Sequence, residues 1–154
     1  MMPVRRVVMS VLALGLLPAC GHALERPESA TNVAQNYVLF CGGCHGEGGR
    51  GVPHKVPALA GKIGRFLGVD GGREFLIWVP GVANSQLSDA GTAAVMNLCL
   101  EKFTAPAERA GVAPYTAADI AAARRRPMLE VERVRHALLA KAGVTDAEIA
   151  VDYY

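Results

Sequence analysis

The chain has 154 residues, of which 51% are hydrophobic and 19% are charged, and its formal net charge is +2. This length predicts one domain, with room for an appendage. The small net charge excludes a general polyanion-binding protein, so we expect no nucleic acid partner.

The first 23 residues predict a secretory signal peptide. Arg5 and Arg6 form a basic start, an apolar stretch follows, and small residues come next. The apolar stretch is too short for a transmembrane anchor. Two cleavage sites stay open. Cleavage before Cys20 would give a lipid-anchored protein, and cleavage after Ala23 would give a soluble periplasmic one. Without this segment the chain has equal numbers of basic and acidic residues.

Hydrophobic residues at spacings of three and four predict helices along the rest of the chain. Ser88 and Thr116 are expected to cap two of them, and Gly143 to end the last. No segment alternates as a strand would, so the predicted fold class is all-α. We expect helices over residues 30–40, 62–67, 71–78, 88–103, 116–125 and 129–141. Glycine and proline predict loops at 46–61, 80–86 and 104–114.

The segment Cys41-Gly42-Gly43-Cys44-His45 fits the C-x-x-C-H pattern of covalent haem attachment. Two thiols at this spacing can form thioethers with the two vinyl groups of one porphyrin. The histidine that follows supplies an imidazole nitrogen to the iron. The motif therefore predicts one covalent haem c bound through Cys41 and Cys44, with His45 as the iron ligand on one face.

Two other interpretations of this cysteine pair are weaker. A redox dithiol expects a preceding strand, and a zinc site expects further cysteines or histidines at ligand spacing. Only His54 lies near in the sequence. Cys99 stands alone in an apolar helix, where a small buried hydrophobic role is expected.

Residues around the motif strengthen this interpretation. They are Tyr37 in the helix before it, the glycine-rich segment 46–51, Val56-Pro57-Ala58-Leu59, Gln86-Leu87-Ser88-Asp89 and Met96-Asn97-Leu98. With these residues the chain resembles class I cytochrome c over residues 30–103. The resemblance implies a cytochrome c-like helical fold around one covalent haem, followed by a linker and C-terminal helices over 104–154. It also implies that the Pro57 carbonyl accepts a hydrogen bond from His45, which would fix the histidine tautomer.

The second iron ligand is not evident. The family usually places a methionine before a proline in the loop ahead of its last core helix, and here that place reads Trp78-Val79-Pro80. Met96 is a candidate ligand, although its place in an apolar stripe favours core packing. Met128 and His54 are weaker candidates. Two alternatives stay open, an iron with two protein ligands and an iron with one open face.

The expected function is electron carriage in the periplasm, between a dehydrogenase and a respiratory acceptor, and not enzymatic catalysis. One alternative is a haem protein that binds a small ligand or has peroxidase-like activity. Another is a cytochrome subunit of a larger dehydrogenase complex, tethered through Cys20 in the lipid-anchored case. The basic residues at 124–126, 133 and 135 are either a docking patch for an acidic partner or a solvated helix face.

Overall fold

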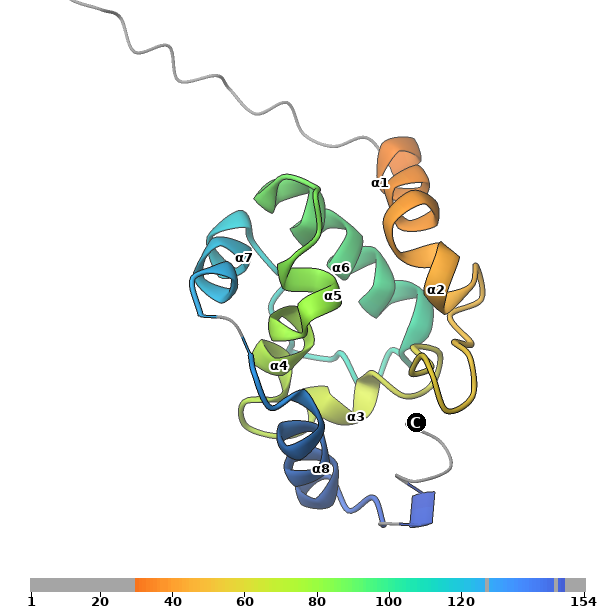
Figure 1. The fold of residues 1–154 in the computed structure, drawn as a ribbon, viewed down its shortest axis with the longest axis vertical. Coiled ribbons are helices and arrows are strands. Elements are labelled where there is room, and N and C mark those ends of the chain that lie inside the picture. The colour runs from red at the N-terminus through yellow and green to blue at the C-terminus, as the bar shows by residue number, and fades with distance from the viewer. Residues whose placement is uncertain (1–29, 127, 146, 149–154) are drawn as a thin grey trace, which may run out of the picture.

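The computed structural model describes residues 30–126, 128–145 and 147–148. The expected signal peptide and Cys20 lie outside the described residues. Within the described ranges the elements are helical, and the extended geometry is limited to an isolated bridge between Val52 and Val56. The helices are α1 (Ala30–Tyr37), the π-helix η1 (Val38–Gly42), α2 (Gly43–His45), α3 (Gly64–Leu67), α4 (Gly72–Trp78), α5 (Pro80–Ala83), α6 (Asp89–Phe103), α7 (Ala117–Arg124) and α8 (Val131–Lys141) (Figure 1). The all-α prediction is confirmed.

The longest of these helices, α6, is the centre of the fold. It begins at Ser88, whose Oγ accepts a hydrogen bond from the Gly91 N–H (3.0 Å), as expected of an N-cap. One face packs against α1, where the rings of Tyr37 and Phe103 lie 5.6 Å apart, and another packs against α7. Most of α6 is buried, so it connects α1, the first helix of the described residues, to α7.

The segment after α4 differs from the loop predicted over residues 80–86. Val79 is extended (φ −59°, ψ 143°), as a residue before proline should be, and this ends α4. Pro80 then occupies the first turn of α5, where its fixed φ suits a helix and no N–H is needed. Proline therefore ends one helix and begins the next, and the loop prediction is wrong for Pro80–Ala83.

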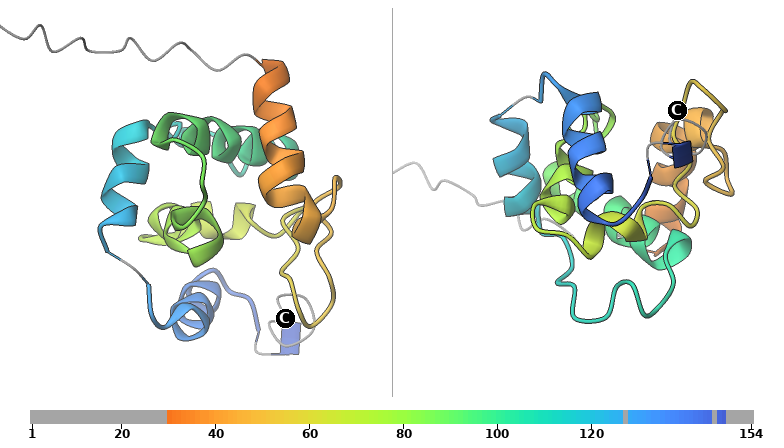
Figure 2. Two further views of the ribbon diagram at one scale, coloured as in Figure 1. Left: turned by 45° about the horizontal axis from the view of Figure 1, so that its top comes forward. Right: turned by 90° about the horizontal axis from the view of Figure 1, so that it is seen from below.

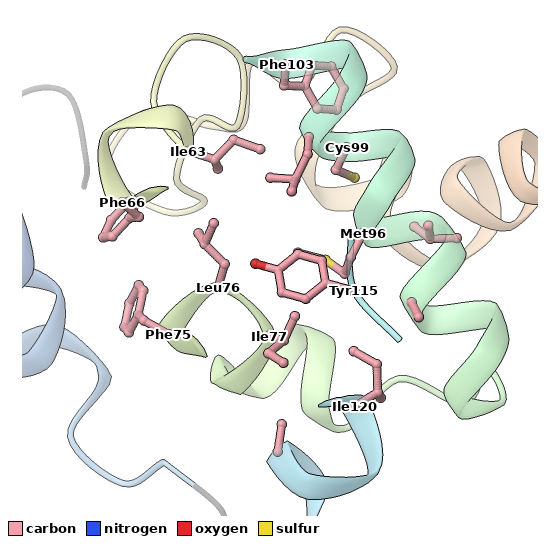
Figure 3. Packing of buried hydrophobic residues seen from close by; sticks show 14 of the residues in the cluster. Ile63, Phe66, Phe75, Leu76, Ile77, Met96, Cys99, Phe103, Tyr115 and Ile120 are labelled. Carbon is pink, nitrogen blue, oxygen red and sulfur yellow. The ribbon is translucent and has the colours of Figure 1, made fainter. Parts of the chain in front are cut away.

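The hydrophobic core lies between α3, α4, α6 and α7. Figure 3 shows Met96 and Cys99 of α6 facing Ile63 and Leu76. The rings of Phe66 and Phe75 stack 5.1 Å apart between α3 and α4. Further along, Ile77, Tyr115 and Ile120 carry the same core to the start of α7. Burial of this apolar surface is what holds these short helices together, since helices of this length are marginal alone.

Arg73 and Tyr115 fasten the start of the C-terminal region to α4. The Arg73 guanidinium lies 4.3 Å from the centroid of the Tyr115 ring and donates to the Ala113 and Pro114 carbonyls (3.1 and 3.0 Å). The Tyr115 hydroxyl donates to the Arg73 carbonyl (2.8 Å). On the other side, Asn97 of α6 exchanges two hydrogen bonds with the Tyr115 backbone.

Arg124 is part of the fold and not part of a solvated basic face. Its guanidinium bonds to Asp89 at the start of α6 (2.6 Å), to the Ser85 and Leu87 carbonyls (both 2.9 Å) and to the Thr92 hydroxyl (3.1 Å). These contacts hold the end of α7 against the loop that begins α6. Arg124 is therefore occupied within the fold and does not belong to one continuous basic surface.

Asp119 gives the first test of this packing. Its carboxylate accepts from the Thr116 N–H (2.9 Å) and the Arg73 guanidinium (3.2 Å), completing the predicted capping box of α7. The hydrogen bond from the Thr116 backbone is the main reason that the pKa of Asp119 lies below its usual value of 3.8. Asp119→Asn should therefore reduce the free energy of unfolding by about 1 kcal/mol at pH 7.

The pH dependence of that loss follows from the sign of the shift. A depressed carboxyl pKa contributes stability that is fully present above the unfolded-state pKa and is lost as the pH falls through the folded-state value. Urea unfolding at pH 7 and at pH 3 should show the gap between wild type and D119N narrowing in acid. Asp70→Asn, at an exposed carboxylate, is the control. A gap of the same size at both pH values would contradict the prediction.

No helix within the described ranges is long and apolar enough to cross a membrane.

Candidate functional site

The site begins where α1 runs without a break through η1 into α2. The π-turn of η1 ends at Gly42, directly after Cys41, and such turns often occur at functional sites. Phe40, Cys41, Cys44 and His45 all line one pocket. Cys44 and His45 follow Cys41 by three and four residues, which puts both of them on the same side of the helix as Cys41.

Cys41 and Cys44 are not joined to each other by a disulfide, and Cys99 lies apart from them on α6. Burial, and then the neighbouring Cys44, raises the pKa of the Cys41 thiol. Cys44 is more exposed than Cys41, so one thiol lies inside the pocket and the other nearer its rim. Both motif cysteines therefore lie where one group bound in the pocket could be attached to them.

His45 is held in one orientation by a backbone carbonyl. Its Nδ1–H donates to the Pro57 carbonyl oxygen at 3.0 Å, which leaves Nε2 without a proton and available as a ligand. Burial lowers the pKa of His45, and the hydrogen bond to Pro57 opposes part of that effect. The neutral imidazole required of a metal ligand is therefore favoured.

The loop from Gly46 to Pro57 fixes both partners of this hydrogen bond. The Tyr37 hydroxyl donates to the Gly46 carbonyl (2.6 Å), and the Gly51 N–H donates to the His45 carbonyl (2.9 Å). Gly51 has φ +65°, and a Cβ placed there would overlap the Val56 carbonyl oxygen. The backbone at Gly51, which is hydrogen-bonded to His45, therefore passes directly against the backbone of Val56 and Pro57.

The pocket is apolar and is built from most of the helical elements. Besides the motif, its walls are Pro57, Ala58, Leu59, Ile63, Phe66, Phe75, Leu76, Val79, Gly81, Val82, Met96 and Cys99, with Arg135. Several of these side chains surround the same central space in Figure 3. An apolar pocket with two thiols, one oriented imidazole and one cation has the donor set that a covalently attached haem requires. The residues fit the cofactor predicted from the motif.

The candidate ligands for the second face of the iron differ in whether they lie in the pocket. Met96 is 9% exposed, belongs to the core cluster and also lines the pocket. Met128 packs against the core outside the pocket lining, and His54 is exposed with φ 58°. Met96 is thus the one methionine of these two that the pocket brings near the motif.

Arg135 is a pocket residue that the sequence alone did not single out. Composition groups it with the exposed basic residues, yet it is 9% exposed. A signal is present in α8, since Arg135 stands four residues after Val131 and four before Leu139, on the apolar stripe of that helix. A charged residue on the buried stripe of an amphipathic helix indicates a role within the fold.

The structure does not support the zinc-site or redox-dithiol interpretations of the two cysteines. In the described part of the chain, no group of three or more His, Cys, Asp or Glu side chains is arranged to hold a metal ion. A redox dithiol motif would follow a strand, whereas Cys41 follows a helix.

Comparison with known proteins adds sequence relatives. No protein-family model matches the chain. A cytochrome c-552 of Thermus thermophilus is 32% identical over 142 residues, which cover 80% of this chain and 89% of that protein. A second cytochrome c-552 of the same species is 32% identical over 106 residues, covering 57% of this chain and 81% of that protein.

Proposed function

Since the chain belongs to the class I c-type cytochromes and therefore carries covalent haem c, we propose that Cys41 and Cys44 attach the haem and that His45 ligates its iron. We further propose that the protein carries single electrons between a periplasmic dehydrogenase and a respiratory acceptor. The observation that supports this assignment most is the His45–Pro57 hydrogen bond, which lies beside both cysteines in an apolar pocket.

The haem supplies one-electron redox chemistry, and the residues of the chain control its surroundings. Pro57 orients the His45 imidazole and raises its basicity as a ligand. Leu59, Ile63 and Leu76 give the pocket an apolar lining, which reduces the solvent that has to reorganise when the charge changes. These contributions suit electron carriage, because they hold one arrangement for both oxidation states.

A second candidate function rests on the wall of the pocket that faces α2. Figure 1 shows α4 and α5 across from α2. The pocket residues of this wall include Leu76 of α4, Val82 of α5 and Val79 between the two helices. These aliphatic side chains offer no metal ligand. An iron held by His45 could then keep an open face on this side, where a small neutral ligand would bind or peroxidase-like activity would arise.

Spectroscopy separates these two functions. If the protein is a carrier with two protein ligands, its purified haem is low-spin and does not bind carbon monoxide. If the face toward α4 and α5 is open, the reduced protein binds carbon monoxide readily. Met96→Leu tests the pocket methionine, and Met128→Leu is the matched control outside the pocket lining. Conversion to high-spin iron in M96L alone would identify Met96 as the ligand, and an unchanged M96L spectrum would exclude it.

A third arrangement keeps the electron-carrying role but fixes the cytochrome to a larger dehydrogenase. It is suggested by the C-terminal helices α7 and α8, and a lipid attachment, if cleavage falls before Cys20, would be consistent with it. Purification from the native membrane and periplasmic fractions distinguishes it from a free carrier. Stable co-purification with a dehydrogenase supports the subunit, and a free periplasmic protein supports the carrier.

A further inference from the structure

Arg135 is a buried cation in the same pocket as the attachment motif. It is 9% exposed and lines the pocket together with Cys41, Cys44 and His45. Its guanidinium carbon lies 6.0 Å from the centroid of the Phe75 ring. A guanidinium has five N–H donors, more than one neighbouring group can use, and its charge attracts anions most strongly where the surroundings are apolar. Arg135 therefore gives this largely apolar pocket a site suited to an anionic group.

The other arginines near the C-terminal helices serve different contacts. Arg133, two residues earlier on α8, has 72% of its side chain exposed and pairs with Glu130. Arg126 lies over the Trp78 ring, 4.9 Å from its centroid, and its carbonyl accepts from the Trp78 indole N–H. Arg124 holds the loop before α6. Arg135 alone among these four arginines lines the pocket of the motif.

The helix that carries Arg135 approaches the fold from a different side than the helices that carry the cysteines (Figure 1). The two thiols come from the end of η1 and from α2. α8 approaches instead from the side of α3, with which it is in contact. Figures 1 and 2 show α6 and α8 on opposite sides of α4. A haem bears its two carboxylate side chains on the ring edge opposite its vinyl groups. Thioethers at Cys41 and Cys44 would therefore direct the carboxylates away from the motif.

We propose that Arg135 binds a haem carboxylate and thereby fixes α8 over that edge of the cofactor. This inference rests on the proposed attachment of haem at Cys41 and Cys44. Guanidinium matches a carboxylate through two parallel hydrogen bonds, and such a pair is strongest where water is excluded. The C-terminal helix is then a part of the haem site, and the charge of Arg135 contributes to the reduction potential.

The test compares Arg135→Gln and Arg135→Lys with the control Arg133→Gln, which removes an exposed charge from the same helix. Loss of the buried cation leaves the carboxylate uncompensated and favours the oxidised, more positive iron. R135Q should shift the reduction equilibrium about tenfold toward the oxidised form, a midpoint decrease of about 59 mV for one electron. R135K keeps the charge and should restore most of the shift. R133Q removes an exposed, screened charge and should change that reduction equilibrium by no more than about twofold.

A second measurement needs no variant. Proton NMR of the reduced holoprotein should give contacts between the Arg135 guanidinium hydrogens and the methylene hydrogens of a haem carboxylate arm. Their absence would overturn the proposal even if R135Q failed to fold. An unchanged midpoint in R135Q, or an equal shift in R133Q, would also overturn it. Loss of α8 amide protection without a potential shift would leave Arg135 with a purely structural role and reject the inference.

Failure of this inference is distinct from failure of the proposed function. The pyridine haemochrome spectrum of the wild type reports thioether-linked haem independently of Arg135. If that spectrum is typical of haem c and R135Q behaves as the wild type, the role of Arg135 is wrong and the attachment stands. If the wild type lacks thioether-linked haem, the attachment itself is wrong.

Discussion

Replacing Cys41 and Cys44 together with alanine should abolish covalently bound haem, whereas replacing Cys99 with alanine should leave it attached. All three cysteines line the same pocket, so the variants differ in which part of its wall they change. Cys41 and Cys44 precede the histidine that Pro57 orients, and Cys99 projects from α6. The comparison therefore tests the motif against a matched cysteine.

The measurement is haem staining after denaturing electrophoresis, together with the pyridine haemochrome spectrum. Each single motif variant should retain one thioether and show a shifted spectrum, and the double variant should show no covalent haem. Retention of haem in the double variant, or its loss in C99A, would contradict the assignment.

The same variants should differ in stability. The cofactor supplies apolar surface to a core made of short helices, and a domain of this size is marginal without it. We expect the far-ultraviolet circular dichroism of the double motif variant to show a large loss of helix. Cys99 is 4% exposed, and its shortening to alanine should cost only about 1 kcal/mol of unfolding free energy. Native helix content in the haem-free double variant would contradict this expectation.

Local chemistry explains which elements could be predicted from the sequence. Ser88 and Thr116 cap their helices through bonds that span three residues, and the sequence predicts both caps. The haem motif is likewise confined to five consecutive residues. The loop predicted at Pro80 is wrong, because the same residue that stops α4 satisfies the requirements of a first helical turn in α5. Proline fixes a boundary, but it does not determine the conformation of the residues after it.

Contacts between distant segments explain the rest. Arg124 binds groups 32 to 39 residues earlier in the chain, and Arg135 reaches a pocket whose motif lies far before it. The contacts of these two arginines depend on how α7 and α8 pack against the earlier helices. No pattern of neighbouring residues in the sequence specifies that packing. The sequence predicts either a docking patch or a solvated helix face for the basic residues over 124–135, whereas burial separates Arg135 from Arg133 on one helix.

Gly51 offers the most demanding test of how the backbone supports the site. A side chain there requires φ +65° and would lie 2.7 Å from the Pro57 carbonyl oxygen, besides its overlap with Val56. Gly61 has nearly the same φ (+68°), but no atom lies within 4 Å of the place its Cβ would take, so Gly61→Ala carries the backbone strain without the collision. That strain is about 1–2 kcal/mol for both variants.

Gly51→Ala should therefore cost about 2 kcal/mol more unfolding free energy than Gly61→Ala, because the Val56–Pro57 backbone must move. Displacement of the Pro57 carbonyl would also weaken its hydrogen bond to His45 and make the imidazole a less basic ligand. A less basic ligand stabilises ferric iron less, so G51A should raise the midpoint potential while G61A leaves it unchanged. Urea unfolding and redox titration of the two holoproteins measure both effects. Equal stabilities and equal potentials would mean that the close backbone contact at Gly51 does not control the position of Pro57.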